Sequence, residues 1–356
     1  MSTLPLNSGG RYCPATDTWV PTALPPNVLS PRELHTGVWT GREMIVWGGS
    51  DGQNYLNTGG RYDPNLDRWT PTSTGANCPA GRGEHTAVWT GTEMIVWGGL
   101  APSYSSTGGR YNPSSDSWQP TSTGTNTPSI RSGQAAVWTG TKMIIWGGYL
   151  SSSYLNSGGC YDPVADSWSI TSTGTNVPSG REYFSCVWTG TAMVVWGGNG
   201  SSGAVNTGGR YDPSANSWLP TSTVSAPTAR QWPSAVWTGS KVVVWGGYLK
   251  NTGGQYDPSA DTWIPTSTGT NCPSNRYHHA AVWTGTEMIV WGGCACNCSP
   301  CSSSLNTGGR YDPSTDSWVP TSMGISIPER RGGNTAVWTG SEMIIWGGVD
   351  NSPTAS

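Results

Sequence analysis

The 356-residue sequence has few charged residues and no long apolar run. Asp, Glu, Lys and Arg make up 11% of it, well below the roughly 25% typical of soluble domains. The apolar runs are too short for a transmembrane helix, and the first 25 residues lack the basic region and apolar core of a signal peptide. The net charge of −3 disfavours non-specific binding to nucleic acid. We therefore expect neither a nucleic-acid partner nor a membrane span.

Phenylalanine is almost absent, whereas tryptophan is abundant. There is one Phe against 22 Trp, and glycine (50) and proline (27) are also frequent. Because disordered chains combine few aromatics with high net charge, this composition predicts a folded protein. Of the 22 tryptophans, only Trp232 stands outside three repeating series of seven. The series are Trp39, Trp89, Trp138, Trp188, Trp237, Trp283 and Trp338; Trp47, Trp97, Trp146, Trp196, Trp245, Trp291 and Trp346; and Trp19, Trp69, Trp118, Trp168, Trp218, Trp263 and Trp318.

The tryptophans belong to a repeat of about 50 residues that predicts four short strands. The first strand carries Ala-Val-Trp, and a Thr-Gly turn leads to a second, Met-Ile-Val-Trp, which ends at a Gly-Gly pair. A polar loop precedes the third strand around Gly-Gly-Arg-Tyr, and an Asp-Pro turn precedes the fourth. Four strands per repeat predict one propeller blade, so the fold class is all-β, a seven-bladed β-propeller of antiparallel blades.

The order of residues within the repeat resembles the Kelch repeat. Residues 82–118 carry it as Arg82, His85, Gly98-Gly99, Tyr111-Asn112-Pro113 and Trp118. The resemblance covers essentially the whole chain, although most Kelch repeats have another apolar residue at the Trp-Thr-Gly position.

The ends of the sequence predict how the ring closes. The chain starts with third and fourth strands and finishes with first and second strands, which we expect to join in one blade and leave no free sheet edge. The prediction is a single domain over residues 1–356. Its closing blade comprises about residues 1–28 and 331–356, and the other blades start near residues 32, 82, 131, 181, 230 and 276.

Strand order assigns the loops to two faces. The loop that leads into each blade (the leading loop) and the loop between strands two and three share one face, here called the mouth face. The Thr-Gly hairpins and Asp-Pro turns share the other, the hairpin face. Because the mouth-face loops vary more, we expect them to carry the function.

An arginine recurs in every leading loop, and we expect these residues to form an arginine ring at the mouth. In Kelch adaptor proteins, arginines at the matching place, together with Asn or Ser residues of the loop between strands two and three, contact acidic peptides. That resemblance implies ligand contacts here for the arginines and for Asn206, Asn251 and Asn306. The alternative is structural: each arginine ties its loop to a neighbouring carbonyl. The ring comprises Arg32, Arg82, Arg131, Arg181, Arg230, Arg276 and Arg331.

Residues that break the repeat are the second set of candidates. Blades four to six place Tyr183, Trp232, Tyr277 and His278 just after the ring arginine, where other blades have mostly small or polar residues. Such aromatics suit sugar stacking or a peptide side chain. The alternative is that they fold over the channel as packing. Five further arginines (Arg11, Arg61, Arg110, Arg210, Arg310) precede the repeat tyrosine, where we expect structural ion pairs.

Two other residue classes have structural interpretations first. The 21 repeated tryptophans are expected to pack between blades, because each can bury a large apolar area. His35, His85 and His279 share one strand position, which favours hydrogen-bonded packing over catalysis or metal binding.

Four cysteines cluster in an insertion of blade six. Cys294, Cys296, Cys298 and Cys301 could bind zinc or copper(I), which favour sulfur ligands, or could form local disulfides, or stay free. The spacing lacks the two separated Cys-x-x-Cys pairs of a standard zinc site. No cofactor is otherwise required.

Three functions fit these observations. The first is a non-enzymatic binding module, monomeric, whose mouth face binds a peptide, a glycan or a small anion. The second is a structural or surface-display repeat protein. The third is an enzyme of the Kelch oxidase or mutarotase type, as the resemblance allows. Low charge, scarce lysine and the cysteine cluster favour an extracellular or cell-surface location.

Overall fold

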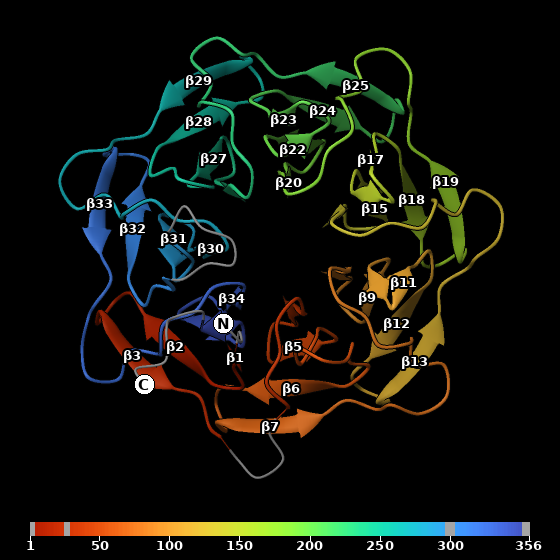
Figure 1. Cartoon of the computed structure of the whole chain (residues 1–356), viewed down its shortest axis with the longest axis horizontal. Coiled ribbons are helices and arrows are strands. Elements are labelled where there is room, and N and C mark those ends of the chain that lie inside the picture. The colour runs from red at the N-terminus through yellow and green to blue at the C-terminus, as the bar shows by residue number, and fades with distance from the viewer. Residues whose placement is uncertain (1–3, 25–28, 296–302, 351–356) are drawn as a thin grey trace.

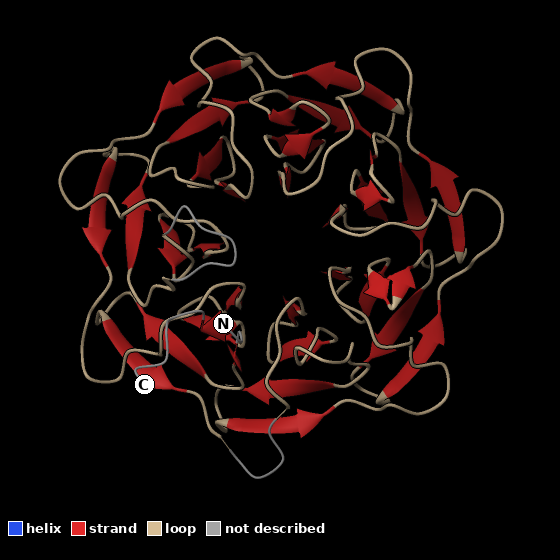
Figure 2. Cartoon of the chain, in the orientation of Figure 1, coloured by secondary structure: helices blue, strands red, loops and turns tan. Residues whose placement is uncertain are grey.

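Seven four-stranded antiparallel sheets surround a central axis in the computed structural model, which describes residues 4–24, 29–295 and 303–350. These residues contain strands and loops and no helix, as Figure 2 shows. The first strand of each blade lies innermost and the fourth lies at the periphery (Figure 1). The predicted seven-bladed, all-β propeller is confirmed.

The strands of each blade follow the repeat, and we number blades 1 to 7 from β4 to β34. The first strands are β4 (Thr36–Trp39), β8 (Thr86–Trp89), β14 (Ala135–Trp138), β20 (Ser185–Trp188), β26 (Ser234–Trp237), β30 (Ala280–Trp283) and β34 (Thr335–Trp338). The second strands are β5 (Met44–Trp47), β9 (Met94–Trp97), β15 (Met143–Trp146), β21 (Met193–Trp196), β27 (Val242–Trp245), β31 (Met288–Trp291) and β35 (Met343–Trp346). The third strands are β6 (Gly59–Asp63), β12 (Gly108–Asn112), β18 (Gly158–Asp162), β24 (Gly208–Asp212), β28 (Gly253–Asp257), β32 (Gly308–Asp312) and β2 (Gly9–Cys13). The fourth strands are β7 (Arg68–Pro71), β13 (Ser117–Pro120), β19 (Ser167–Ile170), β25 (Ser217–Pro220), β29 (Thr262–Pro265), β33 (Ser317–Pro320) and β3 (Thr18–Pro21).

Blade 7 closes the ring as expected. β2 pairs with β35, with Gly9 opposite Trp346 and Tyr12 opposite Met343, so the sheet order is β3-β2-β35-β34. In Figure 1 the red start of the chain lies against its blue end. The short strands β1 (Leu4–Pro5) and β36 (Val349–Asp350) add a second pairing between the two ends.

The apolar cores lie between adjacent blades. The strand-two tryptophan of each blade packs on the strand-four tryptophan of the next, and all seven such pairs have ring centroids 5.1–5.4 Å apart. Trp245 with Trp318 is one example, in a buried cluster that also holds Met288 and Tyr311. Aromatic pairs of this kind contribute about 0.5–1.5 kcal/mol each beyond their buried area. These 14 tryptophans are 0–6% exposed, so the packing prediction is confirmed for them.

The strand-one tryptophans differ from that expectation. They are only half-buried, because they lie where strand one meets the Thr-Gly hairpin. One side packs on a core and the other borders the hairpin face; Trp237, for example, lies against one core cluster and lines a cavity.

Within the described residues, the mouth face carries three additional hairpins between strands two and three. They are β10 (Leu100–Ala101) with β11 (Ser103–Tyr104), β16 (Tyr149–Leu150) with β17 (Ser153–Tyr154), and β22 (Asn199–Gly200) with β23 (Gly203–Ala204). The Gly-Gly pair that precedes this loop adopts left-handed φ, +74° and +94° at Gly48 and Gly49. A Cβ on Gly48 would lie 2.6 Å from the ring of His85 in the next blade, so only glycine allows this approach.

Candidate functional site

The arginine ring is buried beneath the mouth face. Its seven side chains are 0–1% exposed, and burial lowers the pKa of each guanidinium to about 10. At neutral pH the groups therefore stay charged, and they are covered by protein.

The hydrogen bonds of Arg32 illustrate what the ring does. Its Nε donates to the carbonyl of Ser30 at 3.1 Å, and its Nη1 donates to the carbonyls of Gly48 at 2.9 Å and Thr58 at 2.7 Å. Its Nη2 donates to the hydroxyls of Ser30 and Thr58, both at 3.0 Å. The other ring arginines bind the matching carbonyls of their own blades.

The backbone of the same arginine joins two blades. In every blade the arginine carbonyl accepts a bond from the second Gly of the preceding Gly-Gly pair, as Arg82 does from Gly49 at 2.8 Å. These contacts match the structural alternative, in which the arginine ties its loop to carbonyls. The sequence does contain a signal for the residue that accepts the arginine side-chain bonds: a Thr or Ser recurs just before strand three, as at Thr58 and Thr207.

The predicted asparagines lie beside these acceptors. Asn206 and Asn306 are half-buried and Asn251 is exposed. The following threonines, not the asparagine side chains, accept the bonds of Arg181, Arg230 and Arg276. The role of the three asparagines in binding stays a prediction.

The residue two positions after each ring arginine has left-handed φ in all seven blades. Blades 3 and 7 place glycine there, but blades 4, 5 and 6 place Tyr183, Trp232 and His278, with φ of +55°, +56° and +53°. A left-handed conformation costs a residue with a Cβ roughly 1 kcal/mol relative to glycine. Backbone bonds link some of these positions, such as Trp232 N to Tyr183 O at 2.8 Å.

These side chains form one aromatic sector over blades 4 to 6, comprising Tyr183, Trp232, Tyr248, Tyr277 and His278. Trp232 lies at its centre, with ring centroids 4.7 Å from Tyr183, 5.3 Å from Tyr277, 4.9 Å from His278 and 6.2 Å from Tyr248. Tyr277 is buried, His278 is exposed and the other three are half-buried. The structure thus brings the four predicted aromatics together. Sequence reasoning missed Tyr248, although it follows a Gly-Gly pair at a position that varies between blades.

Carboxylates lie beside the aromatic sector. Burial, together with the charge of Glu84, raises the pKa of Glu182 to about 7, and the same two causes raise the pKa of Glu33. A Cβ built on Gly133 would lie 3.3 Å from Glu182 Oε2 and 4.0 Å from the ring of Tyr183, which places that carboxylate beside the sector. With the arginines covered, Glu84 and the ionised fraction of Glu182 supply negative charge near Tyr183.

The histidine column is confirmed as packing. The Nε2 atoms of His35, His85 and His279 lie 2.7–3.1 Å from hydroxyls of the neighbouring blade, and each ring meets a strand-two tryptophan edge-on. Burial lowers the pKa of each to about 3, so the rings are neutral.

The cysteine cluster is described only at its start. Cys294 is 1% exposed, disulfide-bonded and packed against Tyr277. Cys296, Cys298 and Cys301 lie outside the described residues, and the zinc or copper(I) prediction lies there with them. Among the described residues no three His, Cys, Asp or Glu side chains gather as metal ligands.

Comparison with known proteins gives a family. The model of the KLHDC2/KLHL20/DRC7 Kelch-repeats domain matches residues 85–252 and 190–355. No curated protein matches the chain. In the described part of the structure, no helix is long and apolar enough to cross a membrane.

Proposed function

The chain belongs to the Kelch-repeat family, and we propose that it is a non-enzymatic interaction module whose aromatic sector binds a basic segment of a partner protein. The observation that carries this proposal is the stack of Tyr183, Trp232 and Tyr277, aromatic residues that follow the ring arginine in three adjacent blades, where the other four blades have no aromatic residue. Tryptophan and tyrosine are enriched among the residues that dominate binding energy at protein interfaces.

The charge of the neighbourhood supports a basic ligand over an acidic one. The ring arginines have their guanidinium groups bonded to carbonyls and covered by protein, so we assign them the role of holding the mouth loops. The Glu182 carboxylate lies beside Tyr183, and the charges of Glu84 and Glu182 both raise the pKa of Tyr183. A Lys or Arg side chain over the rings would gain both cation–π attraction and an ion pair, and the cation–π part alone contributes about 0.5–2 kcal/mol.

Binding to peptide arrays tests the proposal. Lys- and Arg-containing peptides should bind the wild-type chain, whereas matched Glu-containing peptides should not. Trp232→Gly should lower the affinity at least about tenfold, because it removes the centre of the stack. Glycine occupies the same position in blades 3 and 7, at Gly133 and Gly333, so this variant keeps an allowed backbone.

Leu34→Gly is the matched control. Leu34 has the same left-handed φ in blade 1 but lies outside the aromatic sector, so its replacement should leave peptide binding unchanged. Failure of every basic peptide to bind the folded wild-type chain would refute the proposal, and so would equal binding by Trp232→Gly.

The affinity should also depend on pH. Glu182 has a pKa of about 7, so it is mostly neutral at pH 6 and mostly ionised at pH 8. Affinity for a basic peptide should therefore rise across this range, and Glu182→Gln should remove most of the rise. Isothermal titration at both pH values measures the difference.

A glycan is the second candidate, favoured by the half-buried Trp232, whose ring meets that of Tyr183 while the Glu182 carboxylate lies beside Tyr183. A glycan array run in parallel distinguishes the two candidates. If the chain binds sugars but no peptide, and Trp232→Gly abolishes that binding, the ligand is a carbohydrate.

A further inference from the structure

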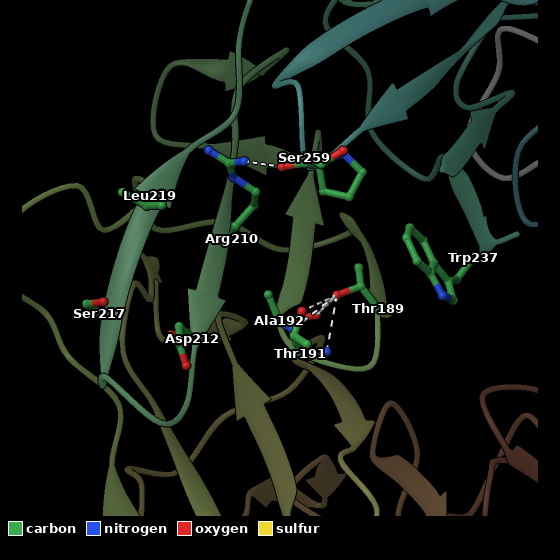
Figure 3. A pocket seen from close by; sticks show the side chains of 10 residues that line it. Thr189, Thr191, Ala192, Arg210, Asp212, Ser217, Leu219, Trp237 and Ser259 are labelled. Atoms are coloured by element: carbon green, nitrogen blue, oxygen red, sulfur yellow. Dashed lines mark hydrogen bonds between the residues drawn. The ribbon is translucent and has the colours of Figure 1, made fainter. Parts of the chain in front are cut away.

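The hairpin face carries a cavity between each of several neighbouring blades. The cavity between blades 4 and 5 has a volume of about 450 Å³ and is lined by Thr189, Ala192, Arg210, Leu219 and Trp237, among others (Figure 3). It lies on the opposite face from the aromatic sector, since the Thr-Gly hairpin and the Asp-Pro turn of the next blade border it.

The residue before the second strand and the third residue of the third strand form a matched pair in each blade. Four blades pair Glu with Arg, at 3.6–3.9 Å between the charged atoms. Two blades combine Lys with an uncharged residue. The pairs in blades 1 to 7 are Glu43 and Arg61, Glu93 and Arg110, Lys142 and Cys160, Ala192 and Arg210, Lys241 and Gln255, Glu287 and Arg310, and Glu342 and Arg11.

Blade 4 is the exception, because Arg210 faces Ala192. Its Nη1 donates to the carbonyl of Pro258 in the next blade, just as Arg61 donates to that of Pro113. The arginine is therefore held in the same way, but within the described residues it has no ion-pair partner. The expectation of an ion pair at this position is wrong for Arg210 and right for the other four arginines of that set.

The rest of the cavity is largely apolar. Figure 3 shows the Arg210 guanidinium at one end and Trp237 at the other, with Ala192 and Thr189 between them. Leu219, directly opposite Arg210 in the β24–β25 pairing, is 55% exposed beside it. Asp212 also borders the cavity, but its carboxylate accepts bonds from the amides of its own turn and lies away from the guanidinium.

We propose that this cavity binds an apolar carboxylate, whose carboxylate group takes the place that Glu fills in the other blades. An arginine fork donates two parallel hydrogen bonds to a carboxylate, and Leu219 and Trp237 offer apolar surface to the body of the ligand. The volume is in the range of small-molecule pockets. This site is independent of the aromatic sector and of the function proposed for it.

Restoring the missing glutamate is the sharpest test. Ala192→Glu creates the pair that four blades already contain, so the variant should fold and should fill the binding position. Titration with 4-phenylbutyrate should show binding to the wild-type chain, and at least about tenfold weaker binding to Ala192→Glu. Arg210→Gln, which copies Gln255 of blade 5, should lose binding to the same extent.

The neutral amide, 4-phenylbutyramide, tests the role of charge and should bind the wild-type chain at least about tenfold more weakly than the acid. A short peptide that ends in phenylalanine, compared with its C-terminally amidated form, distinguishes a protein-borne carboxylate from a free one. Binding of either carboxylate that is lost in Ala192→Glu supports the site.

Trp232→Gly is the control for independence, and it should bind 4-phenylbutyrate like the wild-type chain. The proposal is overturned if neither carboxylate binds the folded wild-type chain, or if Ala192→Glu binds them equally well. Failure of basic peptides to bind would refute only the proposal for the aromatic sector on the mouth face. It would not bear on this cavity, which lies on the hairpin face.

Discussion

The three histidines of the repeat column should make the propeller acid-sensitive. His35, His85 and His279 have a pKa of about 3 in the folded chain, against about 6.5 when unfolded. Between these values the unfolded chain binds more protons than the folded one, so the free energy of unfolding must fall as pH falls below 6.5. This contribution is fully present above pH 6.5 and is lost progressively toward pH 3.

The magnitude follows from the pKa difference. At pH 5 each histidine lowers the free energy of unfolding by about 2 kcal/mol, because each pKa unit corresponds to about 1.4 kcal/mol. Three such residues give about 6 kcal/mol, comparable with the total stability of many domains. Glu182 acts in the opposite direction: its folded pKa is raised to about 7, so acidification from pH 7.5 to 5 returns about 2.5 kcal/mol.

Substitutions taken from the chain itself isolate the histidine contribution. Blade 3 has Gln134 at the position that His85 holds in blade 2, so His85→Gln introduces a residue that this position already carries in another blade. Urea unfolding between pH 5 and 7.5 should give a slope against pH that, at the pH 5 end of this range, is shallower by nearly one proton than that of the wild-type chain. Gln134→His should steepen the slope by a similar amount. The new histidine would find a hydroxyl partner in Thr86, which holds in blade 2 the position from which Thr36 of blade 1 bonds His85. Equal slopes for all three proteins would refute the argument.

Two further changes should act on stability through the mouth face. Arg131→Lys should lower the free energy of unfolding, measured in urea, by about 2–4 kcal/mol, because one ammonium cannot reach the carbonyls of Ser129, Gly147 and Ser157 together. A free energy of unfolding within about 0.5 kcal/mol of the wild-type value, as for a neutral surface change, would contradict the role of the ring arginine in holding the mouth loops. Glu182→Gln should raise the free energy of unfolding by about 3 kcal/mol at pH 8 and change it little at pH 4, because the fold disfavours the ionised carboxylate above its raised pKa. An equal effect at both pH values would show that burial of the charge is not the cause.

Much of the fold could be predicted because each blade repeats the same local chemistry. Gly-Gly, Thr-Gly and Asp-Pro fix the turns, and constant tryptophan spacing fixes which strands face a neighbour. The split of blade 7 between the chain ends follows from the order of the half-repeats, and the β2–β35 pairing confirms it. The half-burial of the strand-one tryptophans did not follow, because periodicity reports where a residue recurs but not how far its neighbours cover it.

The candidate sites depended on contacts between blades. Sequence located Tyr183, Trp232, Tyr277 and His278 as departures from the repeat, but their stacking required three blades to be placed side by side. Tyr248 comes from a different loop of the same repeat, so only the packed blades connect it with Trp232.

By itself, then, the sequence determined the propeller, its number of blades, its closure and the face on which the repeat breaks, since these depend on local turns and on period. Only the tertiary structure decided that the ring arginines hydrogen-bond to carbonyls beneath the mouth face. It also decided that Arg210 lines a cavity without the glutamate that pairs with the equivalent arginine in four other blades. Burial and pairing are set by neighbouring blades, and a repeated residue looks the same in the sequence whether its partner is protein or ligand.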